Sequence, residues 1–93
     1  MSYEINENEF IKAVSKRITK LRRDKGWSQE ELADKMCVER KSISRYETGK
    51  TEMSIYVLAK YIKIFNASPS YILFGNDTDM ISKRKLIALI MEN

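Results

Sequence analysis

Side chains that could bind nucleobases or phosphates gather in one short segment, residues 39–50. Within its helical part, the outward-facing positions with hydrogen-bond donors are Arg40, Lys41, Ser44 and Arg45. Arginine and lysine suit guanine O6 and N7, and one bidentate contact discriminates between bases by ~1–3 kcal/mol. The apolar residues beside them point inward by helical periodicity: Val38, Ile43 and Tyr46. The segment therefore predicts a helix that packs through one face and presents cations on the other.

Other kinds of site chemistry find little support in the sequence. The chain has no histidine and a single cysteine, which excludes a zinc site built from Cys and His. Nucleophile pairs of the Ser-His or Cys-His type are excluded for the same reason. There is also no glycine-rich phosphate loop. We therefore expect no enzyme activity, no cofactor and no metal.

The charge of the chain is unevenly distributed. Residues 12–50 hold twelve Lys and Arg against six Asp and Glu, whereas the remaining residues hold five against seven. A solvated lysine-rich helix face would ordinarily explain such an excess. Its coincidence with the segment described above favours phosphate binding instead. No apolar run approaches the ~20 residues that span a bilayer, and the acidic N-terminus is no signal peptide, so we expect a cytoplasmic protein.

Two short helices joined by a tight turn must position these cations. Residues 29–36 form an amphipathic helix whose inward stripe is Leu32, Ala33 and Met36. The turn at residues 36–38 contains neither proline nor glycine. Ala33 is small enough to let Ile43 of the next helix approach closely. This pattern is typical of a helix-turn-helix, in which the second helix enters the DNA major groove.

The rest of the chain also has helical periodicity. An amphipathic first helix follows the stripe Phe10, Ile11, Val14, Ile18 and Leu21 and stops at Gly26. Ser28 and Glu31 form a capping box for the second helix, and Gly49 ends the third. A fourth helix, near residues 54–66, is expected to pack through one face: Ile55, Leu58, Ala59, Ile62 and Phe65. Residues 70–74 and the tail predict two further helices.

These elements predict an all-α protein with one domain. Residues 1–8 read as a polar lead-in, residues 9–75 as the five-helix domain, and residues 76–93 as a linker and an additional C-terminal helix. The lead-in is acidic, so we do not expect it to wrap a minor groove as basic arms do.

The chain resembles the Cro and phage-repressor type of helix-turn-helix regulator over residues 14–75. The matching runs are KRITKLRRDKGWSQEELADKM, SISRYETGK and SPSYILFG. This resemblance implies a repressor-like fold and a sequence-specific DNA-binding transcriptional regulator, acting as a repressor on a double-stranded operator. It also implies roles for single residues. Base contacts fall on Arg40, Lys41 and Arg45, with Ser44 as a weaker candidate; backbone contacts fall on Gln29, Thr48, Gly49 and Lys50. Arg22 and Glu47 correspond to a partly buried ion pair between the first and third helices.

Two residues depart from the family pattern. Cys37 occupies the turn position where the family prefers glycine, so it must accept a left-handed or otherwise uncommon backbone. We expect its side chain to be a small, semi-buried filler. Glu39 stands where the family usually has a Ser or Thr cap, although a carboxylate still complements the start of a helix.

The tail is more apolar than one small domain needs. Met80, Ile87 and either Ile90 or Met91 fall on one stripe of a helix. We expect a C2 homodimer with the tail or residues 70–74 in its interface. The alternative is that the tail folds back onto the first or fourth helix. An alternative function is a protein-interaction module, or an antitoxin-like regulator that also binds a protein partner.

Overall fold

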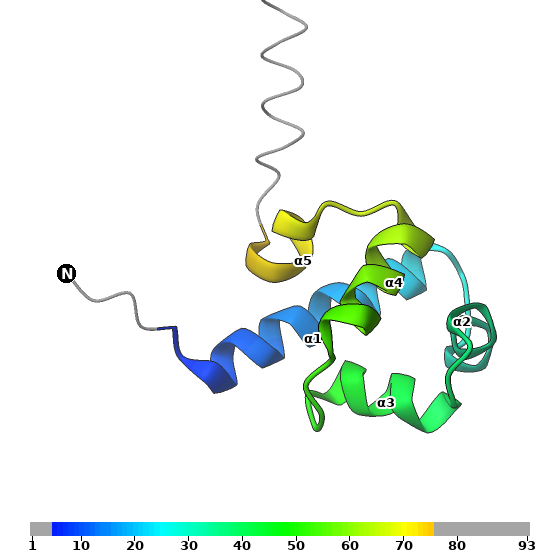
Figure 1. Ribbon diagram of the computed structural model, residues 1–93, viewed down its shortest axis with the longest axis horizontal. Coiled ribbons are helices and arrows are strands. Elements are labelled where there is room, and N and C mark those ends of the chain that lie inside the picture. The colour runs from blue at the N-terminus through cyan, green and yellow to red at the C-terminus, as the bar shows by residue number, and fades with distance from the viewer. Residues whose placement is uncertain (1–4, 76–93) are drawn as a thin grey trace, which may run out of the picture.

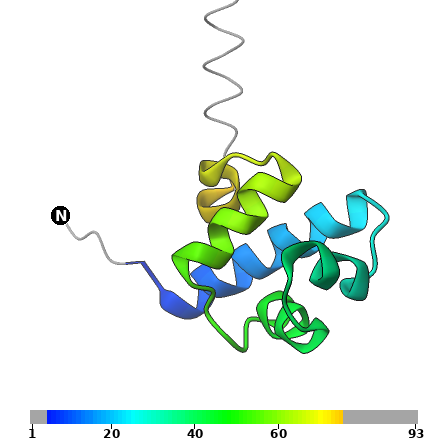
Figure 2. The same cartoon turned by 45° about the vertical axis from the view of Figure 1, so that its right-hand side comes forward.

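The computed structural model describes residues 5–75, which form five helices. They are α1 (Glu7–Asp24), α2 (Gln29–Met36), α3 (Arg40–Thr48), α4 (Ile55–Phe65) and α5 (Pro69–Phe74). α1 is the longest and crosses the middle of the domain, with α3 against one side and α5 against another (Figure 1). α2 packs against both α3 and α4 (Figure 2). The described residues contain no strand, and the predicted all-α fold is confirmed. The predicted C-terminal helix lies outside them.

Local hydrogen bonds fix where the helices begin and end. The capping box of α2 is present, because Ser28 Oγ accepts from the Glu31 amide at 3.0 Å and Glu31 Oε1 accepts from the Ser28 amide at 3.2 Å. Asn6 caps the start of α1, because its Oδ1 accepts a hydrogen bond from the Glu9 amide. The helix therefore begins at Glu7, two residues before residue 9, where the domain was expected to start. Gly49 ends α3 in the left-handed region, with φ of +74°.

The core forms where the predicted stripes of the first three helices meet. Val14 and Ile18 of α1 are buried, as is Ile43 of α3. The predicted stripe of α2 is buried along its whole length: Leu32, Ala33 and Met36. Trp27, between α1 and α2, packs its ring against Phe65 of α4 with centroids 5.4 Å apart. Burial of this apolar surface is the main force holding the helices together.

The buried face of α4 differs from the predicted one. Ile55 is 86% exposed and Ala59 is also exposed. The predicted Phe65 is buried, and the predicted Leu58 and Ile62 are half-buried against the core. The other buried residues are Val57 and Tyr61, which precede Phe65 at four-residue spacing. α4 is apolar on most sides, so periodicity alone did not define its rotation. Contacts with α2 and the ring of Trp27 select the face that is buried.

Candidate nucleic-acid interface

The turn between α2 and α3 is held by a left-handed residue. Cys37 has φ of 56° and ψ of 45°, as expected for a position that usually takes glycine. Its amide donates to Asp34 O at 3.2 Å, and the Val38 amide donates to Ala33 O at 3.0 Å. These bonds satisfy the last carbonyls of α2. The expectation of a semi-buried filler is wrong, because the Cys37 side chain is exposed.

The outer face of α3 presents its cations to solvent. Arg40, Lys41 and Arg45 are exposed and Ser44 is half-buried, whereas Ile43 on the opposite face has no exposed surface. Glu39 precedes the helix without forming a side-chain capping bond. This helix is therefore anchored through Ile43 and offers guanidinium and ammonium donors on the side that faces away from the core.

An ion pair joins α1 to α3. Arg22 Nε lies 2.7 Å from Glu47 Oε2, and Arg22 Nη2 donates to Glu47 Oε1 at 3.0 Å. The two side chains are only 11% and 4% exposed. Arg22 Nη1 also donates to the Trp27 carbonyl at 2.8 Å. The hydrogen bond from Arg22 to Glu47 raises the pKa of Arg22 above its ordinary value. The expected pair is thus present, bidentate and largely shielded from water.

Gln29 extends this ion pair to the outer face of α3, a connection that sequence reasoning missed. Its Nε2 donates to Glu47 Oε1 at 3.1 Å, and its Oε1 accepts from Arg40 Nη1 at 3.4 Å. Gln29 is the first residue of α2, so it also lies where the helix amides and dipole favour an anion. No spacing rule would have found this network, because it joins three helices.

The loop after α3 is held close to α1. Ser15 Oγ donates to the Tyr46 carbonyl at 2.8 Å, and a Cβ on Gly49 would lie 3.3 Å from Ile11 Cγ2. The Lys50 amide donates to Arg45 O, and the Lys50 side chain is exposed. The Thr48 hydroxyl donates back to Ser44 O at 2.8 Å. Lys50 is therefore the residue of this loop whose charge is free to meet a phosphate.

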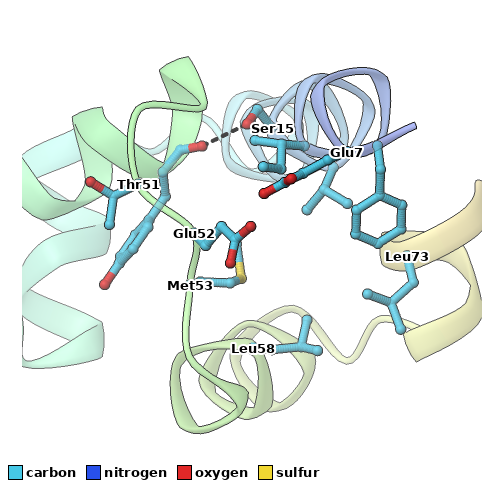
Figure 3. A pocket seen from close by; sticks show the side chains of 11 residues that line it. Glu7, Ser15, Thr51, Glu52, Met53, Leu58 and Leu73 are labelled. Carbon is cyan, nitrogen blue, oxygen red and sulfur yellow. Dashed lines mark hydrogen bonds between the residues drawn. The ribbon is translucent and has the colours of Figure 1, made fainter. Parts of the chain in front are cut away.

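An apolar pocket of about 200 Å³ is lined by none of the cationic residues of α3 (Figure 3). Its walls come from α1, the end of α3, the α3–α4 loop, α4 and α5, and include Phe10, Met53, Leu58 and Leu73. Its volume is below the ~300–1,000 Å³ of most small-molecule sites. Within residues 5–75 no group of Cys, Asp or Glu could hold a metal ion, and no helix is long and apolar enough to cross a membrane.

Comparisons with known proteins agree with this geometry. A helix-turn-helix family model matches residues 18–72. The SPbeta prophage-derived uncharacterized HTH-type transcriptional regulator YonR of Bacillus subtilis (strain 168) is 36% identical over 59 residues, which are 63% of this chain and 55% of that protein. The chain thus spans about half the length of this relative. The matching proteins are named as transcriptional regulators rather than enzymes.

Two solved structures share the fold. A hypothetical transcription factor NHTF from Neisseria superposes with a TM-score of 0.67 at 20% identity, covering 88% of this chain and 93% of that one. The clp gene regulator ClgR from Corynebacterium glutamicum superposes with a TM-score of 0.67 at 26% identity and covers 92% of both chains. The fold of this chain is therefore shared by a hypothetical transcription factor and by a clp gene regulator from two other organisms.

Proposed function

This chain belongs to the helix-turn-helix family of DNA-binding regulators, and we propose that it is a cytoplasmic repressor that recognises a specific operator. The observation that carries the proposal is the cationic outer face of α3, whose inner face is anchored in the core through Ile43. A helix anchored in this way can enter the major groove, where base edges carry a distinct pattern for each base pair.

In this proposal the outer face of α3 reads bases and its neighbours grip the backbone. The base-reading residues are Arg40, Lys41, Ser44 and Arg45. The residues expected at phosphates or beside the backbone are Gln29, Thr48, Gly49 and Lys50. The backbone-contacting residues lie on both sides of the base-reading residues. Gln29 begins α2 beside Arg40, and Lys50 follows the end of α3. The contact from Arg40 to Gln29 would couple one base reader to one phosphate contact.

We further propose that two copies bind as a C2 homodimer, because one recognition helix covers only a short site. α5 offers a surface for this contact, since Phe74 is 57% exposed and its ring lies 6.2 Å from that of Phe10. The tail, the other expected dimer surface, lies outside the described residues. Sedimentation equilibrium of the full chain and of Phe74→Glu, alone and on DNA, tests the contact. A monomeric full chain in both conditions would remove the dimer from the proposal.

The test of DNA reading is selection of bound sites from a random duplex pool. The full chain is expected to enrich one consensus. Alanine variants should each relax it at one or two base positions while circular dichroism stays unchanged: Arg40→Ala, Lys41→Ala and Arg45→Ala. Lys63→Ala is a matched control, because Lys63 is also exposed but lies in the last turn of α4.

Two results would count against this function. If all three variants return the unaltered consensus, the base-reading assignment is wrong. If the full chain enriches no sequence and binds no duplex, the chain is better described as a protein-interaction module that uses the same fold.

A further inference from the structure

A second cationic feature lies outside the helix-turn-helix, in a hollow between α1 and α3. Its walls on α1 are Lys16, Thr19, Lys20, Arg23 and Asp24, and its wall on α3 is Glu47. The α1–α3 hollow is open to solvent, and its three cationic residues are exposed. Lys16 and Arg23 are seven residues apart, so they lie on the same face of α1, about 10 Å apart along its axis.

The charges of the hollow do not cancel. Glu47 is already neutralised by Arg22, with Nε and Oε2 2.7 Å apart. Asp24 is neutralised by Lys20, with Nζ and Oδ2 2.7 Å apart. Within the described part of the chain, neither Lys16 nor Arg23 forms an ion pair or a side-chain hydrogen bond. Two positive charges are therefore left to meet an anion.

The position of the hollow favours a DNA phosphate as this anion. Glu47 is both a wall of the hollow and the hydrogen-bond partner of Gln29, at 3.1 Å. Gln29 begins α2, where a phosphate is expected from the proposed function. If the proposed function holds, a DNA strand that passes the start of α2 would run next to the hollow. The Thr19 hydroxyl does not donate into the hollow, because it already donates to Ser15 O at 2.7 Å.

We propose that the α1–α3 hollow binds a phosphate of the operator backbone, neighbouring the one at the start of α2, through Lys16 and Arg23. The DNA interface then extends from the helix-turn-helix onto α1. This inference rests on the proposed function. The contact adds affinity without reading sequence, because phosphates are the same at every base pair.

The experiment measures salt dependence with the full chain. Lys16→Gln, Arg23→Gln and the double variant each replace a cation by a residue of good helix propensity. Binding to the selected operator and to mixed-sequence duplex is followed by fluorescence anisotropy across salt concentrations. Each phosphate contact contributes about 0.9 to the slope of log K against log salt. Because both cations hold the same phosphate, we expect a slope shallower by about 0.9 for the double variant and by less for each single variant, with an unaltered consensus.

Lys63→Gln is the matched control, because it removes one exposed positive charge from α4 and should leave the slope unchanged. Phosphate ethylation supplies a second readout. Ethylation of at least one phosphate should block DNA binding by the full chain but should not affect DNA binding by the double variant.

A double variant with the original slope and the original interference pattern would overturn this inference alone. An equal change of salt slope in Lys63→Gln would overturn it too, since the change would then reflect the total charge of the protein rather than a local contact. A full chain that binds neither duplex would overturn the proposed function and this inference with it.

Discussion

Glu47→Gln should cost this domain much of its stability while changing its shape very little. The substitution keeps the size of the side chain but removes its charge. Arg22 would then be left charged in a site where its side chain is only 11% exposed. Breaking a buried pair from one side costs about 3–5 kcal/mol, because the remaining charge keeps its desolvation penalty. The glutamine oxygen can still accept one hydrogen bond, so we expect about 3 kcal/mol, the lower end of this range.

Thermal and urea denaturation followed by circular dichroism measure this loss. In a domain of this size each kcal/mol corresponds to roughly 4–8 °C, so Tm should fall by more than about 10 °C. The control is the double variant Arg22→Met with Glu47→Leu, which removes both charges and fills the site with apolar groups. It should recover most of the lost stability, since a buried pair replaced by apolar residues is often nearly neutral.

Either of two results would refute this reasoning. A loss below about 1 kcal/mol for Glu47→Gln would mean that the pair behaves like an exposed one. A double variant no more stable than Glu47→Gln would mean that the cost lies in lost packing rather than in an uncompensated charge.

Three further predictions concern single side chains. Lys50→Ala should weaken binding equally on operator and mixed-sequence duplexes and make the salt slope shallower by about 0.9; an unchanged slope would remove Lys50 from the interface. Cys37→Gly should raise the free energy of unfolding by up to about 1 kcal/mol in thermal denaturation, because φ of 56° strains any residue with a Cβ; a loss would contradict this. Tyr61→Phe should leave stability unchanged or raise it by about 1 kcal/mol, since the Tyr61 hydroxyl is buried with no hydrogen-bond partner among the described residues; a clear loss of stability would reveal a bond to that hydroxyl.

The orphan hydroxyl of Tyr61 also has an electrostatic consequence. Burial raises the pKa of Tyr61 well above its ordinary value, and the nearby Glu47 carboxylate adds to the shift. Tyr61 therefore stays neutral throughout the physiological range, and it contributes to folding through its ring rather than through charge.

The sequence by itself determined the features that depend on neighbours along the chain. Ser28 and Glu31 cap α2 with bonds that span three residues, and Gly49 ends α3 through its own backbone freedom. The buried stripe of α2 was predictable because polar residues flank it. An uncommon backbone at Cys37 was expected because the family that the chain resembles prefers glycine at this turn position, and the structure shows it to be left-handed.

Tertiary structure decided the features that depend on how helices meet. Burial of Val57 and Tyr61 rather than Ile55 and Ala59 follows from the packing of α4, a helix apolar on most sides, against α2 and Trp27. The exposure of Cys37 likewise depends on which groups surround the turn.

The contacts of the candidate interface were decided in the same way. Gln29 reaches Glu47 and Arg40 across gaps of 18 and 11 residues. The α1–α3 hollow exists only because Glu47 of α3 lies beside the face of α1 that carries Lys16 and Arg23. The physical reason is common to all of these features. Periodicity and capping are local properties of one segment, whereas the rotation of a helix and its side-chain partners depend on surfaces brought together by folding.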